Sequence, residues 1–292
     1  MTMRLTICLF ILSALLSAQT HDRAFWQSIG KNKYAVPEHQ SADALAHELS
    51  ALLASPDPGL RDDLAYSILA RWIYRGYLST PALIQLTDAW RANLKDGLGE
   101  SGTNSVLKRS FSALCLSSMA AREAKSPFMG AGRYHELVAE SVTYLQAERD
   151  LRGYDAQLHW IHATAHTADL VGALADSPML TKEEETAILS AIAVRLATAP
   201  DVYTQGEQDR MAAAVTSVIR RPDFDDSSFA AWLSGIETAD RDVWSATNVE
   251  SLAHYQNRTY MLQALAVHLS LEPDSGRIAG FHQKVLAILR NR

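Results

Sequence analysis

Helical periodicity is the feature that most restricts what this 292-residue chain can fold into. Apolar residues recur every three or four positions along nearly the whole chain, as on the buried face of an amphipathic helix. Alternating runs of β-branched and aromatic residues between turn signals, which would indicate strands, are missing. Prolines and glycines divide the pattern into segments, as at residues 55–59 and at Gly76. The sequence therefore predicts an all-α protein.

The predicted helices are joined by short loops and pair at a regular interval. Their approximate ranges are 41–53, 60–75, 80–93, 104–124, 134–150, 156–175, 182–199, 207–220, 228–238, 248–269 and 277–289. Taken in pairs they recur roughly every 40–50 residues, which is typical of a HEAT/armadillo-like stack of antiparallel helix pairs. The pairs share no sequence similarity, so a compact α-bundle or an α/α toroid remains an alternative. No linker or change in composition divides residues 19–292, which we expect to form a single α-helical domain.

The first 18 residues have the pattern of a secretory signal peptide. Arg4 supplies the basic start, residues 5–16 are mostly apolar, and Ser17 and Ala18 are small residues at a plausible cleavage point. The apolar run is shorter than the roughly 20 residues that span a bilayer, although an uncleaved anchor remains an alternative. We therefore expect a periplasmic or secreted protein with no membrane contact beyond this segment.

Charge and cysteine content narrow the classes of function. The formal net charge of −6 does not favour nucleic acid as a partner, since phosphate binding requires a basic face. Removal of residues 1–18 would leave Cys115 as the one cysteine, so no internal disulfide could form. Its apolar helical surroundings indicate a small buried side chain rather than a nucleophile.

One predicted helix, residues 156–175, carries a polar cluster. If this segment is helical, His159, His162, His166 and Asp169 fall within roughly 80° of one another around the axis. From Trp160 onward Asp169 is the one charged residue, so the helix should be buried. Buried imidazoles and a buried carboxylate are destabilising unless they have partners, so specific compensation is expected.

Three hypotheses explain that compensation. The first is a hydrogen-bonded network in which Arg109 or Arg152 pairs with Asp169. The second is a metal site, because His162 and His166 have the i, i+4 spacing of two ligands and Asp169 lies one turn on. Zinc would suit this set and leave a position open for water, although no Glu follows His162 as in a zinc-protease helix. The third is metal-free acid–base catalysis in a cleft.

Several strings of residues also point to a known family. They are Trp26 with Ile29, Tyr34 and Pro37; Arg61-Asp62 leading to Trp72-Ile73; Leu98-Gly99-Glu100; Val106 with Arg109-Ser110-Phe111-Ser112; Glu148 with Asp150-Leu-Arg-Gly-Tyr154; and Trp160-x-His162-Ala-x-Ala-His166-x-x-Asp169-Leu170. From Trp26 to the last helix the chain resembles the bacterial family known as domain of unknown function 2785. The residue before Trp160 is usually glycine in that family, which leaves His162, His166 and Asp169 as the core of any shared site.

The resemblance implies a helical, HEAT-like fold and supplies no activity. It also implies that Arg109, Asp150 and Arg152 lie near the histidine helix. We therefore expect a helical domain that binds a peptide, a protein or a small ligand on its concave side. The alternative is a metal-dependent hydrolase that uses the cluster named above.

Overall fold

A computed structural model describes residues 21–245, 248–273 and 276–292. The predicted signal peptide, residues 1–18, lies outside these ranges. The described residues form helices and one short two-stranded sheet, so the all-α prediction is confirmed. The elements are α1 (Arg23–Lys31), α2 (Ala42–Leu52), the π-helix η1 (Gly59–Tyr66), α3 (Ser67–Arg75), α4 (Thr80–Asn93), α5 (Ser105–Lys125), α6 (Gly130–Ala147), β1 (Tyr154–Asp155), β2 (His159–Trp160), α7 (Ala163–Ala175), α8 (Lys182–Thr198), α9 (Glu207–Ile219), α10 (Asp226–Asp240), the 3-10 helix η2 (Val243–Ser245), α11 (Val249–Leu271) and α12 (Gly276–Arg290).

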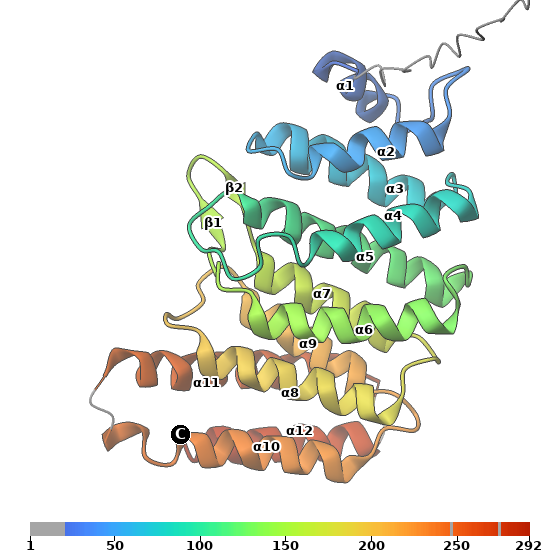
Figure 1. The fold of residues 1–292 in the computed structure, drawn as a ribbon. Helices are drawn as coiled ribbons and strands as arrows, with labels where there is room; N and C mark the ends of the chain where they lie inside the picture. The colour runs from blue at the N-terminus through green and yellow to red at the C-terminus, as the bar shows by residue number, and fades with distance from the viewer. Residues whose placement is uncertain (1–20, 246–247, 274–275) are drawn as a thin grey trace, which may run out of the picture.

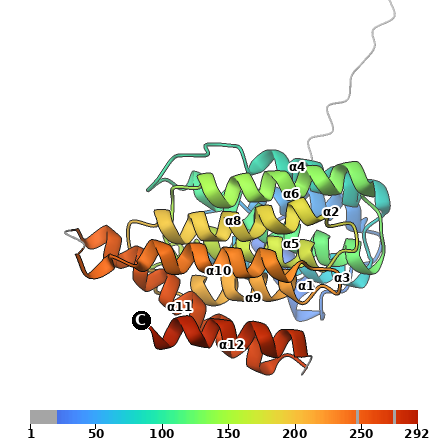
Figure 2. The same ribbon diagram turned by 90° about the horizontal axis from the view of Figure 1, so that it is seen from below.

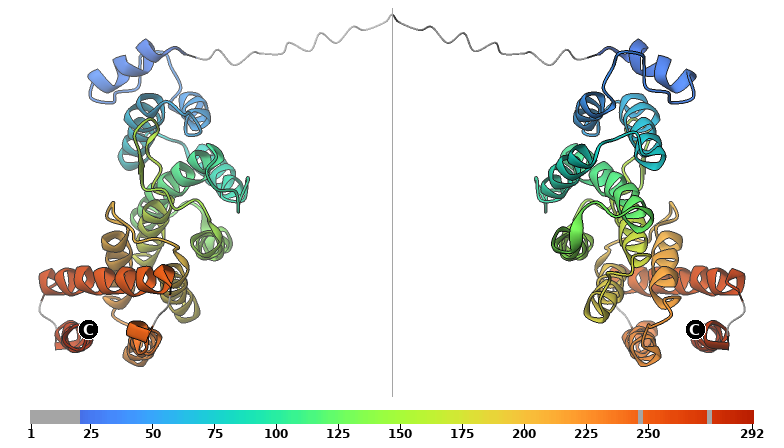
Figure 3. Two further views of the ribbon diagram at one scale, coloured as in Figure 1. Left: turned by 90° about the vertical axis from the view of Figure 1, so that its left-hand side faces the viewer. Right: turned by 90° about the vertical axis from the view of Figure 1, so that its right-hand side faces the viewer.

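The helices lie in two layers. The first, which we call the outer layer, contains α2, α4, α6, α8 and α10, and the second, the inner layer, contains η1 and α3 followed by α5, α7, α9 and α11 (Figures 1 and 2). Within the inner layer α3 packs on α5, α5 on α7, α7 on α9 and α9 on α11. Most helices therefore contact helices that are near in sequence. Figure 3 shows that the long helix α11 projects beyond the rest of the inner layer at one end.

Local signals in the sequence set many of the helix boundaries. The Ser41 side chain accepts a hydrogen bond from the Ala44 amide and caps α2. Thr181 and Glu184 form the predicted capping box of α8. Gly76 ends α3 with a φ of 70°, a conformation in which a Cβ atom would be strained. The helix α1 was not predicted, and the segment 156–175 is helical only from Ala163.

An apolar core runs through the stack from Trp26 to Ile288. The indole rings of Trp72 and Trp90 are fully buried between the layers. Cys115 is buried and free, and burial raises the pKa of its thiol far above the ordinary range, as expected for a packing residue. Within the described ranges, we find no helix with the length and hydropathy of a membrane span.

Candidate functional site

The segment before α7 is a hairpin rather than a continuation of the helix. The amides of Ile161 and His162 donate to the Gly153 carbonyl, and β1 pairs with β2 in antiparallel register. His159 and His162 have φ angles of 58° and 54°, in the left-handed region. The prediction of one helical stripe from His159 to Asp169 is therefore wrong, because the backbone turns before α7 begins.

His162 occupies the N-cap position of α7 and faces the start of α9. Its Nε2 atom lies 3.0 Å from the Gln205 carbonyl oxygen and 3.6 Å from Oε1 of the buried Glu207. Its ring stacks on Trp160 at a centroid separation of 4.7 Å. The imidazole thus joins the hairpin to the loop that precedes α9.

His166 is buried one turn into α7, as predicted, and a serine hydroxyl on α5 compensates it. Its Nδ1 atom lies 2.8 Å from Oγ of Ser110, and that hydroxyl also contacts the Ile161 carbonyl. The hydroxyl has one hydrogen and the carbonyl can only accept, so the imidazole donates from Nδ1. Ser110 is fully buried and donates to the carbonyl, so this pair is not a nucleophile with its base.

Asp169 pairs with an arginine that the sequence did not suggest. Its two carboxylate oxygens lie 3.0 and 3.1 Å from Nη1 of Arg210, which belongs to α9. Burial raises the pKa of Asp169, and the charge of Arg210 opposes that rise. The predicted pairing with Arg109 or Arg152 is wrong, because those two guanidinium groups bind other carboxylates.

Arg109 binds Glu148 in the interior. The Nε and Nη2 atoms of Arg109 lie 2.6 and 3.1 Å from the two Glu148 oxygens, and both side chains are buried. Glu148 Oε1 also accepts from the amides of Arg149 and Asp150. This pair therefore fixes the end of α6 against α5. Glu148 was missed as a partner, although it stands in a string that the family resemblance had marked.

Asp150 and Arg152 bind each other in the connection after α6. Arg152 Nη2 lies 2.6 Å from Asp150 Oδ2, and the same carboxylate accepts from the Gly102 amide. Asp150 thus joins the loop before α5 to the connection that leads into the hairpin. The family residues Arg109, Asp150 and Arg152 position the backbone around the histidines and do not bond to them.

Arg61 holds the hairpin from the other side, and sequence analysis missed its role. It lies fully buried in η1, and its Nη2 atom donates to the carbonyls of Leu158 and Trp160. Its guanidinium carbon lies 4.7 Å from the centre of the Phe111 ring. η1 is a π-helix, a rare conformation that occurs often at functional sites.

The predicted metal ligands do not fit a metal ion. Among the residues that the structure describes, no group of three or more His, Cys, Asp or Glu side chains could hold one. Nδ1 of His166 faces Ser110, Nε2 of His162 faces a carbonyl, and Asp169 faces Arg210. One nitrogen of each imidazole and the Asp169 carboxylate are therefore turned toward protein partners, and the three side chains do not form a group that could hold a metal ion.

The buried state of His166 predicts a pH dependence of stability. Burial, with a smaller contribution from the charge of His162, lowers the pKa of His166 from 6.5 to about 3. The unfolded chain then binds a proton below pH 6.5 that the folded chain does not bind until about pH 3. The stabilising contribution of neutral His166 should be fully present above pH 6.5. The free energy of unfolding should fall as the pH decreases, by about 1.5–2 kcal/mol between pH 6.5 and 5.

Urea denaturation of wild type and His166→Leu at several pH values measures this effect. The variant should show a shallower loss of stability over that pH range. His47→Asn, which changes an exposed histidine on α2, should keep the wild-type dependence. Parallel curves for wild type and His166→Leu would contradict the prediction.

The solvent-facing side of the inner layer has a floor of small side chains. All of them are at least partly exposed, and they come from four neighbouring helices. They are Ser67 and Ala70 on α3, Ser118 and Ala121 on α5, Ala173 on α7, and Ala213 and Ser217 on α9. We call these residues the floor. On one side of it Asp169 pairs with Arg210, and on the other Asp176 pairs with Arg220. The floor therefore consists of small side chains and is bordered by these two ion pairs.

The fold and the site define an all-α protein with a polar hairpin before α7 and partly exposed small side chains on its inner layer. A family model described as Protein of unknown function (DUF2785) matches residues 94–267, more than half of the chain. The chain belongs to this family, which confirms the resemblance seen in the sequence. No curated protein and no solved structure matches it.

Proposed function

We propose that this chain is a HEAT-like binding module that holds an extended peptide on the floor of the inner layer. The observation that best supports this proposal is that the neighbouring helices α3, α5, α7 and α9 all expose small side chains. Small residues let a peptide backbone approach the helices closely, and the ion pairs that border the floor can pair with its amides and charged groups. Parallel inner helices and a second, outer layer are the arrangement that a stack of helix pairs produces.

The polar cluster has a structural role in this proposal. The hydrogen bonds of His162, His166 and Asp169 join the hairpin, α5, α7 and α9, and so keep the helices of the floor in register. The metal-dependent hydrolase has no support from this geometry, because among the described residues His162, His166 and Asp169 do not form a group that could hold a metal ion. We also propose that the protein is exported and that residues 1–18 are cleaved as a signal peptide. The mass of the intact native protein tests this proposal, and a mass that includes residues 1–18 would contradict cleavage.

A bulky residue on the floor should block binding without unfolding the protein. The purified mature chain would first be used to select binders from a random peptide library. Peptides that bind wild type should bind Ala173→Trp at least about tenfold more weakly, because the indole would occupy the floor. The free energy of unfolding should fall by no more than about 1–3 kcal/mol, since Ala173 is partly exposed although it also packs against the core.

The matched control is Val194→Trp, which places the same ring on an exposed position of α8 in the outer layer. It should leave the dissociation constants unchanged. Failure to select any peptide, or equal binding by Ala173→Trp and wild type, would overturn the proposed function.

A further inference from the structure

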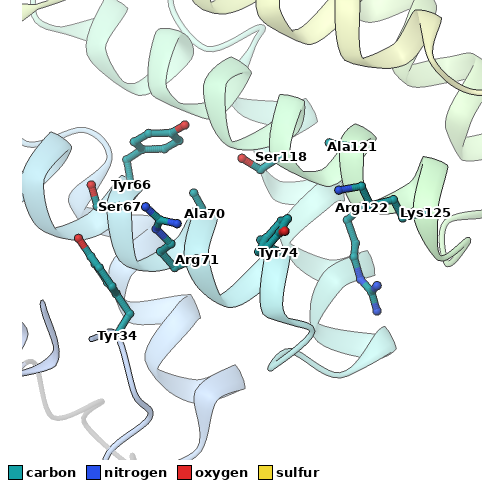
Figure 4. A pocket seen from close by; sticks show the side chains of 10 residues that line it. All are labelled: Tyr34, Tyr66, Ser67, Ala70, Arg71, Tyr74, Ser118, Ala121, Arg122 and Lys125. Carbon is teal, nitrogen blue, oxygen red and sulfur yellow. The ribbon is translucent and has the colours of Figure 1, made fainter. Parts of the chain in front are cut away.

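A cavity of about 380 Å³ lies between α3 and α5, at one end of the floor. Three aromatic and three cationic side chains line it: Tyr34, Tyr66, Tyr74, Arg71, Arg122 and Lys125. Figure 4 shows the Arg71 guanidinium toward Tyr34 and Tyr66, and Lys125 beside Tyr74. The volume is in the range of pockets that bind small molecules or single residues.

The cations of this pocket have no carboxylate partner among the described residues. Arg71 lies 5.7 Å from the centre of the Tyr34 ring, and Lys125 lies 5.0 Å from that of Tyr74. Nε of Arg122 is buried and has no hydrogen-bond partner there. On α9 and at its C-cap, by contrast, Arg210 and Arg220 pair with Asp169 and Asp176. An unpaired cationic group beside a cavity favours an anionic ligand.

The tyrosines add a second requirement. Their ring faces can pack against an apolar or aromatic group, and this contact excludes water from the neighbouring charges. The Tyr66 hydroxyl is neutral at neutral pH, as in any tyrosine, and can donate a hydrogen bond to a ligand. The pocket therefore suits a ligand that combines a negative charge with an aromatic body.

We infer that this pocket binds the C-terminal residue of the peptide, with its carboxylate at Arg122 and Lys125 and an aromatic side chain among the tyrosines. The inference rests on the proposed function, because Ser67, Ala70 and Ala121 belong to both the floor and the pocket lining. It also assigns a direction to the peptide. Asp62 and Asp169 both interact electrostatically with Tyr66, so a carboxylate is disfavoured beside Tyr66 and favoured at Arg122 and Lys125.

Isothermal titration calorimetry with two small probes tests the inference on the mature chain. N-acetyl-L-phenylalanine carries the carboxylate, and its C-terminal amide differs only in lacking the charge. The acid should bind at least tenfold more tightly than the amide. Arg122→Gln and Lys125→Gln should each weaken the acid at least fivefold, and Tyr74→Ala should weaken both probes. Lys284→Gln, which removes an exposed cation on α12, should change neither.

The possible outcomes distinguish failure of the pocket inference from failure of the proposed peptide binding on the floor. No binding of the acid, equal binding of acid and amide, or full affinity in both Gln variants with native circular dichroism would overturn the inference. Inorganic phosphate that displaces the acid at equal concentration would show that charge alone is recognised, which would also overturn it. Selected peptides that bind wild type but not Ala173→Trp would leave the proposed function standing in each of these cases.

Discussion

Replacing Arg109 by methionine is expected to lower the free energy of unfolding by about 3–5 kcal/mol. The substitution would leave the Glu148 carboxylate buried without its cation. Glu148 would keep the amides of Arg149 and Asp150, which compensate only part of the charge. The Asp96 carbonyl would also lose the 2.9 Å hydrogen bond from Nη1 of Arg109.

Urea denaturation followed by circular dichroism measures the effect. Arg133→Met is the matched control, because Arg133 and its partner Asp88 are both partly exposed and solvent-accessible pairs contribute about 0–1 kcal/mol. The double variant Arg109→Met/Glu148→Met should recover part of the loss, since no charge then stays buried. Equal stability of Arg109→Met and Arg133→Met would show that the buried pair is not the constraint described above.

Arg61→Met is expected to lower the free energy of unfolding by about 2–4 kcal/mol and to loosen the hairpin in particular. Arg61 donates to the carbonyls of Ser55, Leu158 and Trp160. A buried acceptor that loses its donor costs about 1–3 kcal/mol, and methionine fills part of the space without replacing any of these bonds. The backbone from residue 153 to residue 162 would lose its connection to η1.

Hydrogen exchange detects this local effect. The amides of Ile161 and His162 should exchange faster in Arg61→Met than in wild type, by more than the global loss of stability explains. Arg75→Met is the control, because Arg75 is exposed and donates to the single carbonyl of Lys33. Unchanged protection of the two amides would contradict the role that we assign to Arg61.

The sequence predicted most of the fold because helix boundaries depend on local chemistry. Ser41, Thr181 and Gly76 act within one turn of their own positions, so their effects can be recognised in sequence. The hairpin before α7 could not be recognised in this way. Its residues follow a helical pattern, and the turn depends on Arg61, which is 97 residues from Leu158.

The site was predicted in part. Burial of His166 followed from the apolar neighbours of α7, and the need for a compensating partner was correct. The partner itself is the Ser110 hydroxyl, 56 residues away, and Asp169 binds Arg210, 41 residues away. No spacing rule relates such pairs. The small-residue floor was also missed, because single Ala and Ser residues on separate helices have no pattern until the helices lie side by side.

The neighbour-to-neighbour packing of the layers has a consequence for how the molecule opens. α1 contacts η1, and α12 contacts α10 and α11, so each end of the stack is held by few elements. The helices at either end can therefore unfold locally while the central helices stay folded, whereas a protein with many contacts between distant elements unfolds cooperatively. A ligand bound across α5, α7 and α9 would then stabilise the central helices against unfolding and have little effect on local unfolding of the ends.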